Sequence, residues 1–398
     1  MSSRLLLFAA TTGYQIRIFA DAARRIGAEL TLATDRCHVM EDPWGDRAIA
    51  VKFDRAAESV ATLLGMPFDG VAAVGDAPAV VAAEAAQALG IPFHPPEAAR
   101  ACHDKYLARA LYRAAGMRVP RFFLLSSGDQ PQFPCVLKPL GMSASRGVIR
   151  ADTATEFHAA AARIRAMGSP EIQVESYIPG REFAVEGLVT KGRFQPIAIF
   201  DKPDPLHGPY FEETIYLTPS REPAAVQQEL LATTRQAIAA LGLWHGPVHA
   251  ELRYNQEGAW MLETHARPIG GLCARSLRFH GGVPLEEIIL RHALGEDVSG
   301  ARLEAGASGV MMIPIPKGGI YESVDGIEEA SAVPGVEEIV ITAQPKQRLI
   351  PLPEGSTYLG FIFARADSTT DVEAALRKSH AELRFRIATA LDTFKPSS

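Results

Sequence analysis

Residues 246–271 read GPVHAELRYNQEGAWMLETHARPIGG and contain two strand-like runs, 249–254 and 259–266, around the turn-rich segment 255–258. Side chains on a strand alternate between its two faces, so each run places every second residue on one face. One face holds His249, Glu251 and Arg253 in the first run and Met261, Glu263, His265 and Arg267 in the second, opposed there by Trp260 and Leu262. If both faces point the same way, the hairpin places Glu251 and Glu263 nearly opposite each other.

Two carboxylates that face each other across a hairpin indicate a site for a divalent cation. Like charges directly opposite each other on neighbouring strands destabilise a sheet, and a cation between them reverses the sign of that interaction. Oxygen-rich sites suit Mg²⁺, which favours one or two carboxylates together with substrate phosphates. The alternative is a solvated hairpin face on which Glu251 and Glu263 are incidental.

The length and composition are those of an ordinary globular protein with more than one domain. The chain has 398 residues, of which 47% are hydrophobic and 22% are charged. The formal net charge of −6 and the lack of any Lys/Arg run give no electrostatic reason to bind nucleic acid. The apolar run 5–10 is too short to span a membrane, and residues 11–15 do not resemble a signal-peptide cleavage region.

Four widely spaced cysteines fit a reducing compartment, so we expect a cytoplasmic protein. They form no CxxC pair, and the sequence therefore indicates neither a structural zinc site nor a disulfide framework. These residues are Cys37, Cys102, Cys135 and Cys273.

Residues 4–94 alternate short apolar runs with helical patterns, which predicts a parallel α/β sheet of Rossmann-like type. Strands are expected at 4–10, 30–33, 49–53, 71–74 and 91–93, and helices at 16–26 and 79–89. No GxGxxG follows the first strand and no GxxxxGK motif occurs. Neither a dinucleotide-binding Rossmann site nor a P-loop is therefore expected.

The rest of the chain is expected to form two further domains. A helix at 96–115 precedes a small α+β unit at 121–190. That unit has strands at 121–125, 135–138, 147–150, 172–178 and 183–189 and a helix at 155–167. Helices at 223–241 and 284–294 flank the hairpin in sequence, and short strands followed by a helix at 369–391 form the last part. The predicted domains are 1–100, 101–300 and 301–398.

A strand that ends on Lys138 and Pro139 runs into a loop of small residues, in the sequence CVLKPLGMSASRGV at 135–148. Small residues such as Ser143 and Ser145 let backbone N–H groups approach phosphate oxygens, and a lysine supplies a point charge for them. The pattern indicates a phosphate-binding loop, with an ordinary glycine-rich turn as the alternative.

A further segment, VESYIPGREFAVE at 174–186, carries Glu175 and Glu182 on either side of a break at 179–180. Backbone groups freed at such a break can pair with an adenine edge, and Glu182 can accept hydrogen bonds from two ribose hydroxyls. Alone, this segment is equally well explained as a surface hairpin, and Lys105 at a helix start as a solvated lysine. The order along the chain is more specific: Lys105, Lys138, Glu175, Glu182, Glu251, Glu263, Arg267.

This order and spacing resemble the ATP-grasp superfamily of ADP-forming ligases over nearly the whole chain. The likeness is carried by DK at 104–105, the KP loop, ESYIPGREF at 175–183 and ETHARPIGG at 263–271. It implies an ATP-grasp fold of mixed α/β and α+β type, with an N-terminal Rossmann-like domain, a lid subdomain at about 121–190 and a C-terminal lobe. It also implies ATP and Mg²⁺ (or Mn²⁺) as cofactors.

The resemblance assigns a role to each nucleotide-site residue. Lys105 and Lys138 resemble lysines that contact ATP phosphates, with Ser143 and Ser145 in the adjoining loop. Glu175, Ser176 and Ile178 resemble the strand that contacts adenine. Glu182 resembles the acid that binds the ribose.

The hairpin residues take the metal and catalytic roles. Glu251 and Glu263 resemble the magnesium-bridging pair. Arg267 resembles the arginine that stabilises the acyl phosphate and the tetrahedral intermediate, with Gly270 beside the substrate. His265 stands where many members carry asparagine; an imidazole can ligate a metal or bond a phosphate, but Mg²⁺ prefers oxygen. A contact of His265 with substrate or phosphate is therefore the alternative to a metal contact.

Within the superfamily, the chain most resembles the L-amino-acid ligases, which join a carboxylate to an amine. The segments IFDKP at 199–203, FEETIY at 211–216 and GVMMIPIP at 309–316 carry this likeness. Lys202 and Glu213 are expected to orient the carboxylate and the amine, unless they form a surface salt bridge. His249 is either a proton shuttle beside the substrate or a hydrogen-bonded structural residue.

The predicted function is an ADP-forming carboxylate–amine ligase that passes through an acyl phosphate shielded by the lid. Its partners are a small-molecule carboxylate and a small-molecule amine, with a homodimer as a family-level expectation. One alternative is a purine-pathway or carboxylase-type ATP-grasp enzyme that activates formate or bicarbonate. Another is a catalytically silent ATP-binding regulator, against which Arg267 argues because ATP binding alone does not need it.

Overall fold

The computed structural model describes residues 2–10, 15–35 and 48–389. The chain divides into two compact units, each assembled from separated segments. The first unit comprises Met1–Arg121, Ile178–Asp201 and Ser220–Ala305, and the second comprises Phe122–Tyr177, Lys202–Pro219 and Gly306–Ser398. The predicted domain limits at residues 100 and 300 divide the chain by sequence instead, and they stay predictions.

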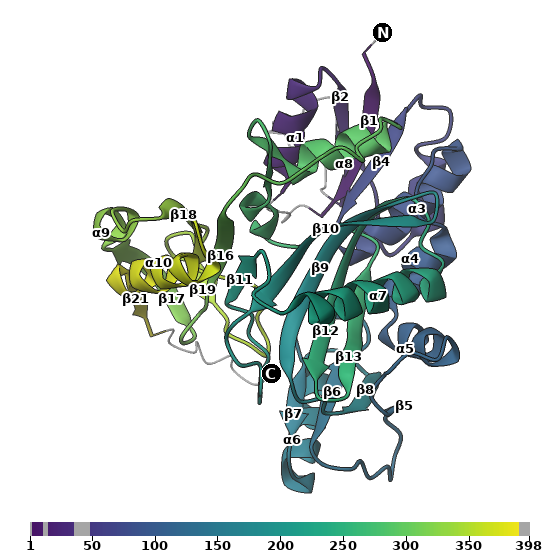
Figure 1. The fold of residues 1–398 in the computed structure, drawn as a ribbon. Coiled ribbons are helices and arrows are strands. Elements are labelled where there is room, and N and C mark those ends of the chain that lie inside the picture. Colours follow the sequence, from purple (N-terminus) through teal and green to yellow (C-terminus); the bar gives the residue numbers. More distant parts are fainter. Residues whose placement is uncertain (1, 11–14, 36–47, 390–398) are drawn as a thin grey trace, which may run out of the picture. The chain divides into compact units, whose positions relative to one another are not determined.

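A parallel four-stranded sheet with the order β3-β2-β1-β4 begins the first unit (Figure 1). Its strands are β1 Arg4–Ala9, β2 Glu29–Thr34, β3 Ala48–Ala50 and β4 Gly70–Val74, accompanied by helices α1 Ile16–Arg25, α2 Ala56–Ala61 and α3 Asp76–Leu89. The central strand β1 is buried from Leu5 to Ala9, as its continuous apolar run requires. The predicted parallel α/β domain is confirmed, although its third strand covers 48–50 rather than 49–53.

The predicted fifth strand at 91–93 is wrong. Gly90 ends α3 in a left-handed conformation, and the backbone N–H of Ile91 donates to the Ala86 carbonyl at 2.9 Å. Phe93 still packs in the core, but residues 91–93 join no sheet. The apolar pattern predicted the burial of Phe93 correctly. It did not predict the secondary structure, because apolar residues after a helix end and apolar residues in a buried strand look alike in sequence.

The predicted helix at 96–115 is two helices, α4 Pro96–His103 and α5 Lys105–Ala114. Asp104 separates them, because its side chain accepts hydrogen bonds from two backbone N–H groups of the next turn, each at 2.9 Å. An aspartate in this role begins a new helix. Lys105 is consequently the first residue of α5.

The antiparallel sheet of the first unit has the strand order β13-β12-β9-β10. Its strands are β9 Arg181–Thr190, β10 Arg193–Lys202, β12 Gly246–Asn255 and β13 Gly258–His265. Helix α7 Ala224–Leu241 lies against β12 and β13, and its buried Leu230 and Ile238 belong to the same core as Val248 and Leu252 (Figure 1). The unit is completed by η2 Cys273–Ser276, β14 Arg278–Phe279, β15 Val283–Pro284 and α8 Leu285–Ala293.

Two adjacent buried glutamates on α8 differ in their hydrogen-bond partners. Glu286 is buried, neither of its carboxylate oxygens has a hydrogen-bond partner among the described residues, and burial raises its pKa to about 7. Glu287 is also buried, but it accepts hydrogen bonds from Arg25 at 2.9 Å and from Arg291 at 3.0 Å.

Glu286→Gln is expected to raise the thermal unfolding midpoint at pH 8 and to leave it nearly unchanged at pH 5. A carboxyl group whose pKa is higher in the folded state stabilises the fold only while it is protonated. Ionisation of Glu286 therefore costs up to roughly 3 kcal/mol as the pH rises from about 4.5 to about 7. Glu287→Gln, the matched control, should lower the midpoint at both pH values. Equal effects of Glu286→Gln at the two pH values would contradict this interpretation.

The second unit contains strands of three sheets. One has the order β5-β8-β6-β7, one has β11-β16-β20-β18, and the third has β19-β17-β21. The elements are β5 Phe122–Leu124, β6 Cys135–Pro139, β7 Ile149–Ala151, α6 Ala154–Ala166, β8 Ile172–Ser176, β11 Ile215–Thr218, β16 Ala307–Ile313, β17 Gly319–Asp325, α9 Ile327–Ser331, β18 Val336–Ile341, β19 Arg348–Leu349, β20 Gly360–Ala366, α10 Thr369–Glu382 and β21 Arg384–Ala388.

The predicted helix at 369–391 is wrong in its second half. Helix α10 ends at Glu382, and the next residues form β21, which pairs antiparallel with β17. Residues 390 and 391 lie outside the described part of the chain. The sequence RFRIA of β21 alternates, as expected for a strand with one buried face, and its partner strand lies about sixty residues earlier.

Among the described residues, Cys102, Cys135 and Cys273 form no disulfide, whereas Cys37 lies outside the described ranges. Within those ranges, the structure has no helix that combines the length and the apolar character needed to cross a bilayer.

Candidate active site

The β12–β13 hairpin pairs the two predicted metal carboxylates as expected. Glu251 is the register partner of Glu263, and His249 is the partner of His265. The imidazole rings of the two histidines are stacked, with centroids 5.7 Å apart. The hairpin therefore brings two carboxylates and two imidazoles together on one face.

Two residues of the hairpin, Met261 and Trp260, were assigned to the wrong face, and Trp260 pairs with Arg253. A β-bulge follows Glu251, so that Leu252 pairs with Met261. Met261 is fully buried in the core with Leu252 instead of sharing the face of Glu263. A bulge adds one residue to one strand and reverses the alternation beyond it.

The first histidine of the hairpin bridges two carboxylates. His249 Nδ1 lies 3.0 Å from Glu186 Oε2, and its Nε2 lies 3.3 Å from Glu251 Oε1. Burial lowers the pKa of His249 even though Glu186 favours the charged ring, and burial raises the pKa of Glu186. A neutral ring that donates from Nδ1 to Glu186 carries its lone pair on Nε2.

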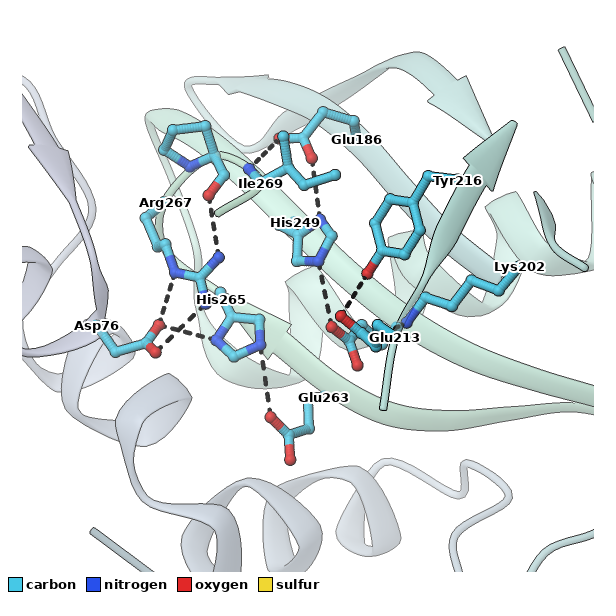
Figure 2. Close-up of polar contacts among 12 residues, drawn as sticks. Asp76, Glu186, Lys202, Glu213, Tyr216, His249, Glu263, His265, Arg267 and Ile269 are labelled. Carbon is cyan, nitrogen blue, oxygen red and sulfur yellow. Dashed lines mark hydrogen bonds and ion pairs between the residues drawn. The ribbon is translucent and has the colours of Figure 1, made fainter. Parts of the chain in front are cut away.

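The second histidine has a parallel arrangement, joined by an arginine (Figure 2). His265 Nδ1 lies 2.9 Å from Asp76 Oδ1, and His265 Nε2 lies 3.5 Å from Glu263 Oε2. Arg267 donates from Nε to Asp76 Oδ1 at 2.8 Å and from Nη2 to Oδ2 at 3.3 Å. Burial opposes ionisation of Asp76, but Arg267 and His265 outweigh it and hold the pKa of Asp76 well below its ordinary value.

The loop after β13 is held by buried polar side chains. Glu186 Oε1 accepts a hydrogen bond from the Ile269 backbone N–H at 3.1 Å, and Gln15 Nε2 donates to the Ile269 carbonyl at 2.7 Å. Arg267 Nη1 donates to the Pro268 carbonyl at 3.0 Å. The exposed Gly270 directly follows, so the segment that carries Arg267 and Gly270 has a fixed backbone.

The hairpin residues fit a divalent cation. Glu251 and Glu263 are about one-fifth and one-quarter exposed, and like charges at paired positions repel each other unless a cation lies between them. Their oxygens are the donors that Mg²⁺ prefers, and the adjacent imidazoles are held from behind by carboxylates, as is common around metal sites.

The adenosine-site prediction concerns Ile178 and Glu182 in the first unit. Arg253 connects them, donating from Nε to Glu182 Oε2 at 2.9 Å and from Nη1 to the Ile178 carbonyl at 2.7 Å. Both side chains of the Arg253–Glu182 pair are less than 10% exposed, so the carboxylate is fixed in place. Sequence analysis placed Arg253 on the hairpin face without giving it this role.

The predicted phosphate lysine of the second unit, Lys138, lies on β6. Its Nζ is 2.9 Å from Glu175 Oε2, and Gln173 Nε2 donates to Glu175 Oε1 at 2.6 Å. Two predicted nucleotide residues are thus paired with each other. In the adjoining loop, Ala144 and Ser145 both have φ near +55°, an uncommon conformation for residues other than glycine.

Lys202 and Glu213, predicted for the substrates, form an ion pair in the second unit. The Lys202 side chain is only 3% exposed, so the pair is not the surface salt bridge considered as the alternative. Tyr216 donates its hydroxyl hydrogen to Glu213 Oε2 at 2.8 Å.

Three family models match consecutive parts of the chain. They describe an ATP-grasp N-terminal domain at residues 20–93, an ATP-grasp domain at 131–276 and an L-amino acid ligase C-terminal domain 2 at 311–388. The chain is therefore a member of the ATP-grasp superfamily with the mixed α/β fold of its ligases, as predicted. Within that superfamily, it resembles the L-amino-acid ligases.

Individual proteins give the same picture. The crystal structure of the L-amino acid ligase from Bacillus licheniformis matches with a TM-score of 0.82 and 25% identity, covering 98% of this chain and 99% of that one. The uncharacterized protein y4rH of Sinorhizobium fredii is 22% identical over 82% of this chain and 70% of its own length. A D-alanine–D-alanine ligase of Pseudomonas putida is 26% identical over 46% of this chain, which spans 60% of that ligase. ATP and Mg²⁺ are the cofactors of an ATP-grasp domain, as predicted.

Two carboxylates of this site, Asp76 and Glu186, were not predicted from the sequence. Asp76 directly follows the glycine at the end of a parallel strand, which is the edge where α/β sheets place functional groups. Glu186 is a single charge within the apolar run FAVEGLV. The sequence context of each residue was unusual, but it did not identify the side chain that the residue contacts.

Proposed function

We propose that the protein is an ATP-dependent, ADP-forming ligase that joins the carboxylate of an amino acid to an amine through an acyl phosphate. The observation that supports this most is the paired Glu251 and Glu263 beside an arginine, Arg267, that Asp76 holds in place. A protein that only binds ATP has no need of an ordered guanidinium beyond the metal carboxylates.

In the proposed reaction, an oxygen of the substrate carboxylate attacks the terminal phosphorus of ATP, and ADP leaves. The amine nitrogen then attacks the acyl carbon, a C–N bond forms, inorganic phosphate leaves and the amine loses a proton. Bound Mg²⁺ would supply positive charge to the phosphates, held by Glu251 and Glu263. The protein's share of such a reaction is mainly positioning and charge neutralisation.

The remaining residues take roles that fit their chemistry. Lys105 and Lys138 supply positive charge to phosphate oxygens, with Ser143 and Ser145 beside Lys138. Arg267 stabilises the negative charge of the acyl phosphate and the tetrahedral intermediate. His249, whose Nε2 carries a lone pair when the ring donates to Glu186, accepts the proton of the amine.

The substrate roles of Lys202, Glu213 and Gly270 belong to the same proposal. The ionised pair Lys202–Glu213 offers one group for a carboxylate and one for an ammonium. Glu175, Ser176, Ile178 and Glu182 would contact the adenosine of ATP. The cytoplasmic location and the homodimer stay predictions.

Incubation with ATP, Mg²⁺ and a matrix of amino-acid pairs is expected to release ADP and phosphate in equal amounts for the correct pair. Hydroxylamine should trap a hydroxamate of the acid substrate when the amine is left out, because it attacks an acyl phosphate. The Glu263→Gln variant serves as the inactive control. AMP as the main nucleotide product would overturn the proposed mechanism, because adenylation releases AMP.

A further inference from the structure

Asp76 lies far from the hairpin in sequence but contacts it directly. It is the first residue of α3, immediately after β4 and Gly75, whose φ of +96° turns the chain there. Its partners His265 and Arg267 follow 189 and 191 positions later. Helix α3, which follows the parallel sheet, therefore contributes the Asp76 side chain to the loop that carries Arg267.

Three side-chain N–H groups donate hydrogen bonds to Asp76. Oδ1 accepts from His265 Nδ1 at 2.9 Å and from Arg267 Nε at 2.8 Å, while Oδ2 accepts from Arg267 Nη2 at 3.3 Å. A carboxylate can accept all three hydrogen bonds, whereas an amide of the same shape has one acceptor and turns its own N–H₂ toward a donor. The arrangement thus requires the charged carboxylate and not merely a polar group of that size.

The contact with His265 sets the orientation of that ring. Since Asp76 occupies Nδ1, Nδ1 carries the proton and Nε2 is the nitrogen directed at Glu263. The contact with Arg267 leaves part of the guanidinium available. Three of its five N–H groups donate to Asp76 and to the Pro268 carbonyl, and the other two have no hydrogen-bond partner among the described residues.

We propose that Asp76 is a positioning residue of the ligase site, which fixes the Nδ1–H tautomer of His265 and the orientation of Arg267 at the same time. The inference rests on the proposed function and adds a residue to it. The competing explanation is a purely structural ion pair between Asp76 and Arg267. Breaking a buried ion pair is costly, so loss of Asp76 could lower activity by destabilising the fold alone.

Asp76→Asn is expected to lower kcat by about 10- to 100-fold, the range typical of residues that orient a ligand or catalytic group from behind. The KM for ATP should change by less than about threefold, because no adenosine or phosphate role is assigned to Asp76. Glu287→Gln makes the same carboxylate-to-amide change in a buried group with two arginine partners outside the site, and it should leave kcat unchanged. Asp76→Glu retains both oxygens and should recover part of the lost activity.

A double-mutant cycle separates positioning from structure. If Asp76 acts through Arg267, Asp76→Asn should lower kcat much less in the Arg267→Ala background than in the wild type. Full additivity of the two changes, or a loss of kcat in Glu287→Gln equal to that in Asp76→Asn, would overturn the proposal.

A spectroscopic test does not depend on turnover. The ¹⁵N NMR signals of His265 in the wild-type protein at pH 8, assigned with His265→Asn, should show the Nδ1–H tautomer. A spectrum with the proton on Nε2 would overturn the proposal. Failure of every amino-acid pair to release ADP would instead count against the proposed function, since the tautomer is set by Asp76 whatever the substrates are.

Discussion

Glu263→Ala is expected to lower turnover by at least about 10³-fold and to remove most of the Mg²⁺ dependence of nucleotide binding. Glu263 is the register partner of Glu251, and the two carboxylates together supply the oxygen ligands of the proposed metal site. Removing one leaves a single carboxylate, which binds Mg²⁺ far more weakly. ADP release under saturating substrates and calorimetric titration of ATP at several Mg²⁺ concentrations measure the two effects.

Glu257→Ala is the matched control for this experiment. Glu257 lies in the exposed turn of the same hairpin, so the variant removes an equal charge without touching the paired carboxylates. It should retain wild-type turnover, whereas Glu251→Ala should behave like Glu263→Ala. Near-normal turnover of Glu263→Ala at low Mg²⁺ would contradict the two-carboxylate site.

The hairpin shows how much of a site local sequence can predict. Alternation groups Glu251 and Glu263 on polar faces, but the turn alone does not pair them. Counted from the Asn255–Gly258 pair, an unbroken register would place Glu251 opposite Leu262, and the bulge moves its partner to Glu263. The bulge after Glu251 was not predictable from the same pattern. An extra residue leaves no mark in composition, whereas the strand register and the burial of Met261 show it in the structure.

The wrong secondary structure predictions share one physical cause. Residues 91–93 and 384–388 are short segments whose state depends on what lies beside them. The first finds no partner strand, and the second pairs with β17, far earlier in the chain. The local sequence pattern indicates that such a segment is partly buried. Whether it forms a strand depends on a partner strand far away in the sequence.

Partners within the site were the least predictable feature. Asp76, Glu186 and Arg253 fix residues that the motifs identified, but each does so across a long stretch of chain or from a neighbouring strand. Motif spacing identifies groups that contact ligands, because chemistry restricts their type. The residues that orient those groups are restricted only by geometry, which the sequence does not display.

Arg267→Ala is expected to lower kcat by about 10²- to 10³-fold while ATP affinity changes by no more than a few-fold. Arg267 lies outside the predicted adenosine-binding segments, and its guanidinium is oriented by Asp76 and the Pro268 carbonyl. Its other two N–H groups have no partner within the described part of the chain. Charge that develops in the acyl phosphate and tetrahedral intermediate is stabilised most by a donor that is already oriented. Single-turnover ADP release and calorimetric titration with ATP separate the two quantities.

The variant also removes the arginine partner of the buried Asp76, so a lower unfolding midpoint is expected and must be measured beside the rate. Arg25→Ala is the control, because it removes an arginine from the buried Glu287 while Arg291 remains, and it lies outside the site. It should lower stability without lowering kcat. If ATP affinity fell as much as kcat in Arg267→Ala, Arg267 would be a ground-state nucleotide ligand. If Arg267→Ala kept its ATP affinity and lost kcat, Arg267 would act mainly in the transition state. An arginine that Asp76 already orients can stabilise the transition state without reorganisation.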